Sequence, residues 1–420
     1  MDLPRKLNIL SIGEYPPFPG GSSGGGLSVC EELTKLGHHV TIVTQTVPGK
    51  EFPKHSKIKF VPVETKRILD VDPKLYEIIR WHRQFRGLGG EIARIPFVNA
   101  MKREIKQQRP DVILVNYGVP YLNFTLPLAK KEKIPVVTIL SGSDVHTLPT
   151  RPYRKIKKPL LNAYHNSDGL ITISDYLKDI LHQLGVKSAV TIRNAIDTKL
   201  FSPLQPSEKT RERSELGIRE NETVFVHVST LKPIKDPLRI VEAASIALKK
   251  NPNMHFVIVG DGDLRGAMEK LVEEKNIGNK FKFVGTQKPD QVRKYMGLAD
   301  CFVISSLNEG LANVLLEAQA VGIPTIASRA GAMPEIVKHN DTGLLFEPGN
   351  AGDFAKCMVQ MSDPNVRERL TRNAREASKN ISLEKMGQRY HEFILRTIEL
   401  HKSRGKHIPR EHLPTGSRLH

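Results

Sequence analysis

The segment DCFVISSLNEGLANVLLEAQAVGIPTIAS, residues 300–328, joins two short apolar runs through a longer stretch of helical character. Short runs rich in β-branched and aromatic residues are typical of buried strands, so the order strand, helix, strand predicts a βαβ unit of a parallel sheet. The segment also carries two acids, Glu309 near the start of the helical stretch and Glu317 among its apolar residues. A carboxylate in the second place is costly to bury unless it has a partner.

The same alternation runs through most of the 420 residues and falls into two series. Nearly continuous hydrophobicity in the strand-like runs indicates strands that are covered by helices on both faces. We therefore predict two doubly wound domains facing each other, with ligands beyond the carboxyl ends of the strands. The first series is KLNILSIG, HVTIVT, DVILVN, PVVTILSG, GLITIS and AVTIRN, and the second is TVFVHVS, MHFVIVG, KFKFVG, DCFVISS and IPTIAS.

The polar stretch 202–221 is the predicted linker and domain opening. It divides the chain into an N-terminal domain, residues 1–201, and a C-terminal domain, residues 202–382. We expect a final helix over 383–402 to pack back on the N-terminal domain, and a basic, flexible tail over 403–420.

Composition excludes several classes of protein. With 39% hydrophobic and 26% charged residues the chain is of the globular kind. No apolar run reaches the roughly 18 residues of a membrane-spanning helix, and the N-terminal apolar stretch is too short for a secretory signal, so we expect a cytoplasmic protein. Its three cysteines, Cys30, Cys301 and Cys357, are too widely spaced for a CxxC site and suggest neither a disulfide framework nor a bound metal.

The net charge of +18 is unevenly distributed, because residues 1–200 carry 30 Lys and Arg against 18 Asp and Glu. Such a field attracts nucleic acid, anionic lipid or a phosphorylated substrate without choosing among them. Two features concentrate it, RPYRKIKK at 151–158 and LYEIIRWHRQFRGL at 75–88. On a helix the second would place arginines beside an apolar face, the pattern of an interfacial helix. The alternative is that this apolar face packs within its own domain.

A glycine-rich segment follows the first predicted strand of the first series, and two lysines follow the first predicted strand of the second series. Glycine-rich loops before a helix let backbone amides approach a phosphate, although this one matches neither GxGxxG nor a Walker A loop and could be a lid without a ligand. Two lysines after TVFVHVS could neutralise a diphosphate leaving group, or could be ordinary surface residues. Two glycines in VGDGDLR allow a tight turn beside a ligand or a simple turn. These residues are Gly20, Gly21, Gly24, Gly25 and Gly26, Lys232 and Lys235, and Gly260 and Gly262.

The two acids of the opening segment gain a meaning if a helix begins near Gly310, capped by Asn308 or a neighbour. Glu309 would then lie at the helix mouth and Glu317 two turns further, about 12 Å along the axis. The vicinal hydroxyls of a ribose are suitable partners for Glu317, since a carboxylate accepts two hydrogen bonds at once. The alternative is an acid favoured by the helix dipole together with a partly exposed Glu317.

In combination these stretches resemble the retaining glycosyltransferases of the GT-B fold, the family 4-like or group 1 enzymes. The resemblance runs from about residue 7 to 390. Its pieces are the glycine segment followed by GHHVTIVT, then ISDYLK, IRNAIDTKLF and VGDGDLR, and the block from ADCFVISS to LLFEPGN. It implies two Rossmann-like domains facing across a cleft and a nucleotide-sugar donor bound by the C-terminal one.

The resemblance also implies roles for single residues. Glu309 and Glu317 match an E-x7-E motif whose first acid faces the donor sugar and whose second holds the ribose. Lys235 matches a lysine that binds the diphosphate, and Gly260 lies on the same donor side. Gly20 and Gly21 match a loop that closes over the donor from the other domain. The amides expected to bind the sugar and diphosphate are those of Gly310, Leu311, Ala312, Asn313 and Val314.

This chain departs from the family pattern in two places. Many relatives have arginine where this chain has Thr230, and Lys232 is the candidate substitute. Relatives often have histidine where this chain has Ser141, while Gly142 and Asp144 keep the pattern. We expect Asp144 on the acceptor side, together with His146, which could reach the space of the missing histidine.

The sequence thus predicts a glycosyltransferase that moves a sugar from a nucleotide diphosphate donor to an acceptor with retention of configuration. Neither a metal nor a cofactor is expected besides the nucleotide-sugar co-substrate, and no nucleic-acid partner. The basic N-terminal half favours a lipid-linked or otherwise anionic acceptor, met by peripheral association at the inner face of the cell membrane. Competing hypotheses are an epimerase or phosphorylase of the same fold, and a non-enzymatic basic protein that binds nucleic acid or membrane.

Overall fold

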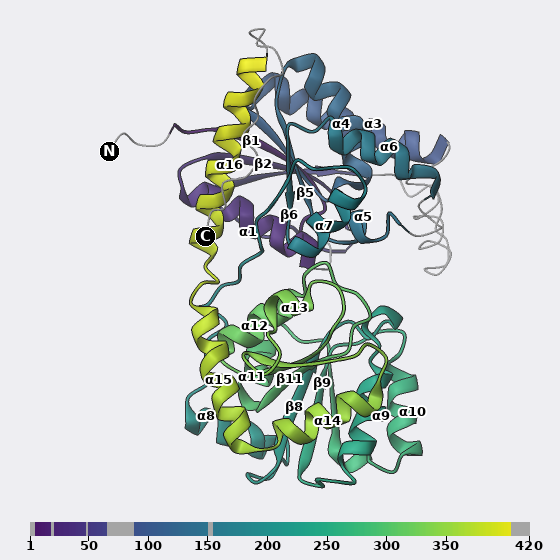
Figure 1. Ribbon diagram of the computed structural model, residues 1–420. Helices are drawn as coiled ribbons and strands as arrows, with labels where there is room; N and C mark the ends of the chain where they lie inside the picture. The colour runs from purple at the N-terminus through teal and green to yellow at the C-terminus, as the bar shows by residue number, and fades with distance from the viewer. Residues whose placement is uncertain (1–4, 18–20, 48, 65–87, 150–153, 405–420) are drawn as a thin grey trace.

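The chain forms two α/β domains stacked one above the other (Figure 1). They are seen in a computed structural model that describes residues 5–17, 21–47, 49–64, 88–149 and 154–404. The basic segment 75–88 lies outside the described residues except for Leu88, and so do residues 151–153 of the second basic segment.

The N-terminal domain is built on a sheet of seven parallel strands in the order β3-β2-β1-β4-β5-β6-β7. Most strand residues are buried, as expected of a sheet that is covered on both faces. The strands are β1 (Asn8–Gly13), β2 (His39–Gln45), β3 (Ile58–Val63), β4 (Val112–Asn116), β5 (Val136–Leu140), β6 (Gly169–Thr172) and β7 (Ala189–Thr191). The described helices are α1 (Gly21–Lys35), α3 (Leu88–Gln108), α4 (Gly118–Glu132), α5 (Ser143–His146), α6 (Arg154–His165) and α7 (Asp175–Gln183).

The C-terminal domain repeats this plan with six parallel strands in the order β10-β9-β8-β11-β12-β13. Its strands are β8 (Thr223–Val228), β9 (Met254–Val259), β10 (Phe281–Gly285), β11 (Cys301–Ile304), β12 (Thr325–Ser328) and β13 (Gly343–Phe346). Its helices are α8 (Pro206–Glu215), α9 (Leu238–Ala247), α10 (Arg265–Glu274), α11 (Pro289–Leu298), α12 (Asn313–Val321), α13 (Met333–Ile336), α14 (Ala351–Met361) and α15 (Pro364–Ser378), with the 3-10 turns η2 (Pro233–Lys235) and η3 (Gly278–Lys280).

The predicted fold class is confirmed, because both sheets are wholly parallel and alternate with helices. Two edge strands were absent from the prediction. In β3 buried and exposed residues alternate and Pro62 interrupts the apolar run, so the run is weak in hydrophobicity. β13 is a run of four buried residues, GLLF, that directly follows the turn 340–342. A run this short cannot be assigned to a strand by its periodicity.

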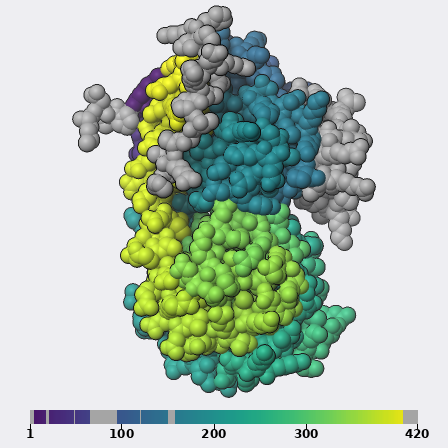
Figure 2. All heavy atoms as spheres, viewed as in Figure 1, coloured from purple at the N-terminus to yellow at the C-terminus, as the bar shows by residue number. Residues whose placement is uncertain are grey.

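The last helix, α16 (Leu383–Arg404), leaves the C-terminal domain and lies along the N-terminal one. Figure 2 shows the C-terminal segment passing along one side of both domains. The backbone of Gly387 lies so close to Glu32 of α1 that an added Cβ would be 2.6 Å from its Cβ. Further along, His401 forms an ion pair of 2.8 Å with Asp168 when it is protonated. The helix therefore ties the end of the chain to the first domain.

The polar stretch 202–221 contains helix α8, which packs against α11. Arg213 of α8 is buried and its Nε donates to the carbonyl of Leu298 at 2.7 Å. The stretch is thus a packed part of the C-terminal domain as well as its opening. Within the described ranges, no helix combines the length and the apolar character needed to span a bilayer.

Candidate functional site

The carboxyl ends of the central strands β8 and β11 carry a lysine and a glutamate that form an ion pair. Lys235 ends the turn η2 after β8, and its Nζ lies 2.5 Å from Glu309 Oε1 in the loop after β11. Only 24% of the lysine side chain and 12% of the glutamate side chain are exposed. The ammonium group has three donors, so it can hold Glu309 and still donate to a phosphate oxygen.

Two hydrogen bonds keep these loops side by side. Ser305 Oγ donates to the carbonyl of Lys235 at 2.9 Å, and the amide of Leu307 donates to the carbonyl of Ile234 at 2.8 Å. Lys232 belongs to the same turn, because its carbonyl accepts from the amide of Lys235. Its side chain is exposed and forms no ion pair with the described part of the chain. The turn therefore presents one paired and one unpaired lysine.

Helix α12 begins at Asn313, and the prediction of a start near Gly310 with Asn308 as cap is wrong. Ala312 is the N-cap and makes no side-chain capping bond. The preceding backbone is held by other elements instead, since the carbonyl of Gly310 accepts from Ser174 Oγ at 2.6 Å and the carbonyl of Glu309 accepts from the amide of Ala332 at 3.0 Å. Tertiary contacts thus fix an extended entry to the helix.

The five predicted amides consequently belong to two kinds of structure. Gly310, Leu311 and Ala312 lie in the buried entry loop, while Asn313 and Val314 form the first turn of α12. The amides of a first turn have no partner within their own helix and face outward along its axis. The segment therefore still offers an anion-binding end next to Lys235 and Glu309.

Glu317 lies one turn into α12, half-buried, and has no hydrogen-bond or ion-pair partner among the described residues. Burial alone raises the pKa of its carboxyl group from 4.5 to about 7. A carboxyl in this situation gains from any donor that a ligand brings. Its assignment to a ribose stays a prediction.

The two domains touch at Gly310. A Cβ added there would lie 2.7 Å from Gly142 Cα and 3.0 Å from the carbonyl oxygen of Ser141. Only glycine fits so close an approach of two backbones. The loop after β5, which carries the family departure Ser141, is thus placed directly against the loop that carries Glu309.

Asp144 shapes this loop from within. Its carboxylate is fully buried and accepts hydrogen bonds from the amides of Gly142 at 2.8 Å, Ser141 at 3.1 Å and Gly118 at 3.2 Å. Burial raises the pKa of Asp144 to about 6, against the lowering effect of these bonds. The structure therefore gives Asp144 a loop-holding position, and its contact with an acceptor stays a prediction.

His146 and Ser141 face the same region. His146 is half-buried, and burial lowers its pKa although the charge of Glu309 acts in the opposite direction. The imidazole lies beside the Ser141–Gly142 loop, since a Cβ added to Gly142 would be 4.0 Å from His146 Nε2, and its assignment to the place of the missing histidine stays a prediction. Ser141 Oγ is buried without a hydrogen-bond partner in the described ranges, so a polar group is still to be satisfied there.

The glycine-rich segment was predicted to be a loop that precedes a helix, and this is wrong for its described part. Gly21, Gly24, Gly25 and Gly26 form the first turns of α1. Close packing requires glycine at Gly26, where a Cβ would lie 2.2 Å from Asn116 Nδ2, whereas a Cβ on Gly24 would meet nothing within 4 Å. Gly20 lies outside the described residues.

The N-terminus of α1 meets that of α12. Asn313 Nδ2 donates to the carbonyl of Gly21 at 3.4 Å, and Asn194 Nδ2 donates to Asn313 Oδ1 at 3.0 Å. Two helix N-termini, one from each domain, therefore converge beside the ion pair. Both carry partial positive charge, which favours an anion between the domains.

Gly260 supports the lysine turn from the neighbouring strand β9. Its φ of +125° suits glycine, and an added Cβ would lie 1.8 Å from the carbonyl oxygen of Ser229. Gly262 packs in the same way on Leu231. Both glycines let the loops after β8 and β9 lie together, and the donor contact expected of Gly260 stays a prediction.

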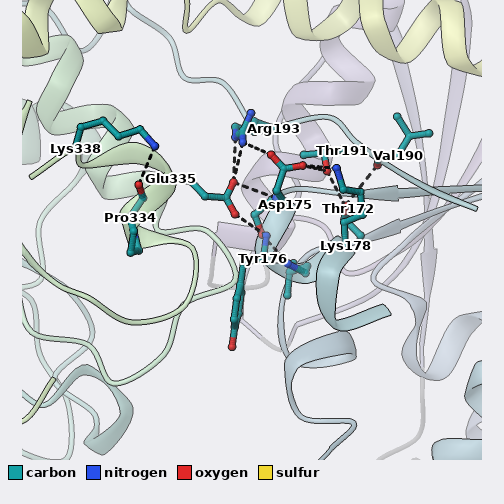
Figure 3. A network of polar contacts seen from close by, with 12 residues as sticks. Thr172, Asp175, Tyr176, Lys178, Val190, Thr191, Arg193, Pro334, Glu335 and Lys338 are labelled. Carbon is teal, nitrogen blue, oxygen red and sulfur yellow. Dashed lines mark hydrogen bonds and ion pairs between the residues drawn. The ribbon is translucent and has the colours of Figure 1, made fainter. Parts of the chain in front are cut away.

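Sequence reasoning assigned no role to four residues that link the domains beside this site. They are Ser174 and the three residues Tyr176, Arg193 and Glu335, which Figure 3 shows. All four stand in stretches that we quoted for the resemblance, but their partners in the other domain lie about 130 to 160 residues away. The one local signal is Ser174, whose side chain caps helix α7. In the described part of the chain, no group of three or more His, Cys, Asp or Glu side chains is arranged to hold a metal ion.

Two family models match the chain and together span most of it. Residues 19–200 match the family described as Glycosyltransferase Family 4, and residues 208–377 match the family described as Glycosyl transferases group 1. The two matches correspond to the two sheets.

Curated relatives cover nearly the whole length. The N-acetyl-alpha-D-glucosaminyl L-malate synthase of Bacillus anthracis is 26% identical over 86% of this chain and 90% of its own. The alpha-monoglucosyldiacylglycerol synthase of Acholeplasma laidlawii is 25% identical over 87% of this chain and 90% of its own.

Solved structures share the whole fold. The Anabaena protein HepE, in complex with UDP, superposes with a TM-score of 0.74 at 18% identity, covering 93% of this chain and all of its own. The sucrose-phosphate synthase of Thermosynechococcus elongatus superposes with a TM-score of 0.73 at 20% identity, covering 96% of this chain and all of its own.

Proposed function

Because this chain belongs to the family 4 and group 1 glycosyltransferases of the GT-B fold, we propose that it transfers a sugar from a nucleotide diphosphate donor with retention of the anomeric configuration. In this reaction the bond between the anomeric carbon and the diphosphate oxygen breaks, and its electron pair leaves with the diphosphate. A bond forms from the acceptor oxygen to the same face of the anomeric carbon, and the acceptor proton leaves with the products.

The observation that carries this proposal is the Lys235–Glu309 pair at the entry to α12. Lys235 stabilises the negative charge that develops on the departing diphosphate, and the converging N-termini of α1 and α12 add to this effect. We infer that the donor sugar binds beside Glu309, and this is supported by the close approach of the neighbouring Gly310 to the Ser141–Gly142 loop of the other domain. Structures of the related HepE are described with UDP, with UDP and glucose, and with UDP-glucose, which supports a nucleotide-sugar donor here.

We also propose that the reaction needs no metal ion. The work that a divalent cation does elsewhere, neutralising the diphosphate, falls here to Lys235, Lys232 and the helix N-termini. Turnover in the presence of EDTA is then expected to equal turnover with added Mg²⁺ or Mn²⁺. A loss of activity with EDTA that either ion restores would contradict this part of the proposal.

For the acceptor we propose a lipid-linked or otherwise anionic molecule reached at the inner face of the cell membrane. The basic excess of the N-terminal half supports it. So do the names of two relatives, one of which makes an N-acetylglucosaminyl L-malate, whose malate part is an anion, and the other an alpha-monoglucosyldiacylglycerol, a lipid. The buried, unpartnered hydroxyl of Ser141 and the nearby His146 are groups that an acceptor or the donor sugar could satisfy.

A panel of UDP-, GDP- and ADP-sugars tests the function directly. Retaining transferases hydrolyse their donor slowly without acceptor, so one member of the panel is expected to release nucleoside diphosphate. Nuclear magnetic resonance of the product formed with an acceptor then reports the anomeric configuration. Release of nucleotide from none of the donors, an inverted product, or conversion of the donor sugar to its epimer would each contradict the proposal.

A further inference from the structure

A network of ion pairs and hydrogen bonds joins the two domains beside the site (Figure 3). Its centre is the carboxylate of Glu335, on the short helix α13 of the C-terminal domain. This carboxylate accepts from the amides of Asp175 at 3.0 Å and Tyr176 at 2.6 Å, which open helix α7 of the N-terminal domain. It also accepts from Arg193, at 3.2 Å from Nε and 2.9 Å from Nη2.

Each bond in this network is of a strong kind. The first amides of a helix have no partner in their own helix and carry partial positive charge, so a carboxylate at that place is favoured. Glu335 supplies it from the other domain, and only 16% of its side chain is exposed. Arg193 also forms an ion pair with Asp175 at 2.5 Å, which fixes the guanidinium between two acids. The Arg193 and Asp175 side chains are 41% and 39% exposed, so solvent weakens their ion pair, and the more buried bonds of Glu335 to the two amides hold the geometry best.

Glu335 joins helices α7 and α13, and residues at the starts of the same two helices hold the loop that carries Glu309. On the N-terminal side, Ser174 Oγ donates to the carbonyl of Gly310 at 2.6 Å, and Tyr176 OH donates to Asn308 Oδ1 at 3.2 Å. On the side of α13, the amide of Ala332 donates to the carbonyl of Glu309 at 3.0 Å. Hydrogen bonds from both domains therefore hold the three-residue segment Asn308–Gly310, with Glu309 at its centre.

We propose that Glu335 is a positioning residue that latches the closed arrangement of the two domains and so holds Glu309 in register with the Ser141–Gly142 loop. The inference rests on the proposed transfer reaction, for which Glu309 and that loop must meet around the donor sugar. Glu335 itself does not reach the donor residues Lys235 and Glu317 through any contact among the described residues. Its removal should therefore slow the reaction and leave donor binding in place.

The test compares Glu335→Ala with Glu347→Ala, a matched control. Glu347 lies in the same domain and pairs with Arg329 at 3.1 Å, but it is 63% exposed and contacts only its own domain. For Glu335→Ala we expect kcat to fall about 10- to 100-fold, the range that loss of hydrogen bonds to one charged group gives. The dissociation constant of the nucleoside diphosphate, measured by calorimetry, should stay within about threefold of wild type. The control should leave both quantities unchanged.

A conservative variant guards against a folding defect. Glu335→Gln keeps the shape of the side chain but turns one acceptor into a donor that faces the amides of α7, so a smaller fall in kcat is expected with the same unchanged nucleotide affinity. If Glu335→Ala does not fold, this variant takes its place. Full kcat in a folded variant overturns the inference, and so does a loss of nucleotide affinity in proportion to the loss of kcat.

Small-angle X-ray scattering separates this inference from the proposed function. With saturating nucleoside diphosphate, wild type should have a smaller radius of gyration than Glu335→Ala, because the latch favours the closed form. Equal radii would overturn the latch even in an active enzyme. If wild-type protein turns over no nucleotide sugar, the proposed function fails, whereas the scattering comparison still decides whether Glu335 closes the domains.

Discussion

The two domains share one plan of sheet and helices, yet they carry charge differently. Residues 201–400 hold 28 Lys and Arg against 26 Asp and Glu, whereas residues 1–200 hold 30 against 18. In the C-terminal domain many charges are paired at close range, as between Lys280 and Glu222 at 2.7 Å. A surface hollow of the N-terminal domain holds basic side chains without an ion-pair partner in the described ranges, namely Lys102, Lys106, Arg109 and Lys133.

This difference shows where charge marks a site and where it does not. In the C-terminal domain the totals of positive and negative charge nearly cancel, so position marks the site: Lys232 and Glu317 have no ion-pair partner in the described ranges and both lie near the carboxyl end of the sheet. In the N-terminal domain unpaired lysines are common, so no single one identifies a site. There the information lies in the surplus itself, which favours an anionic partner.

The largest effect is expected at the ion pair of the C-terminal domain. Lys235→Ala should reduce kcat about 100- to 1000-fold, because its charge matters most as the diphosphate departs. Lys232→Ala should act in the same direction if that lysine replaces the arginine missing at Thr230. The control is Lys250→Ala, an exposed lysine at the end of α9. Near-normal turnover in both site variants would remove the lysine turn from catalysis, and the comparison of matched and unmatched charges would lose its main support.

Glu317, which has no partner among the described residues, should affect the binding of the nucleotide sugar and not its turnover. Glu317→Ala is expected to weaken binding of the nucleotide sugar about 10- to 100-fold, as hydrogen bonds to a charged group contribute about 1.5–3 kcal/mol. Calorimetry measures the affinity, and thermal unfolding checks that the fold is intact. Glu273→Ala, on the exposed face of α10, is the control. Unchanged affinity would place Glu317 outside the donor site.

The raised pKa of Glu317, about 7, predicts a pH dependence of donor binding. Ribose hydroxyls donate to the ionised carboxylate, so affinity should rise by about tenfold at most from pH 6 to pH 8, as the ionised fraction does. Binding to Glu317→Gln should vary less with pH. In the absence of a ligand, the stability of the fold changes with pH in the opposite direction to donor affinity. The folded pKa lies above the unfolded value of 4.5, so ionisation costs the fold and stability falls as pH rises from 4.5 to about 7.

Two measurements would contradict this account. One is donor binding by wild type that varies with pH no more than binding by the variant. The other is a stability curve of Glu317→Gln that falls over the same pH range as that of wild type.

Most of the fold could be read from the sequence because central parallel strands are continuously apolar and the helices between them are long. β3 was missed because buried and exposed residues alternate in it and Pro62 interrupts it, and β13 because its apolar run has only four residues. The same local reasoning brought together Lys235 and Glu309, 74 residues apart, since both follow central strands and so meet at one edge of the sheet.

The remaining features depend on contacts that no local pattern encodes. The start of α12 at Asn313 is set by Ser174 and Ala332, and Gly26 of α1 packs closely on Asn116 at the end of another strand. Glu335 resembles any helix-start acid until its partners in the other domain are known. Such residues are found only when the two domains are seen together.

The smallest effect is expected in the basic N-terminal domain, where each lysine contributes little to the attraction of an anionic partner. Lys158, exposed near the start of α6 in the basic segment 151–158, should add about 1 kcal/mol to attraction by an anionic bilayer, so Lys158→Gln should weaken sedimentation with vesicles about fivefold. The matched control is Lys133→Gln. Lys133 lies in the basic hollow, just before strand β5 and so at the amino end of the N-terminal sheet, away from the end that faces Glu309. Vesicles with increasing anionic lipid, at low and high salt, give the measurement. If both variants lose vesicle binding equally, the attraction comes from the total positive charge and not from a particular surface. Negligible binding by wild type to neutral and anionic vesicles alike would leave the basic surface without a membrane role. The excess of positive charge would then favour a soluble anionic acceptor.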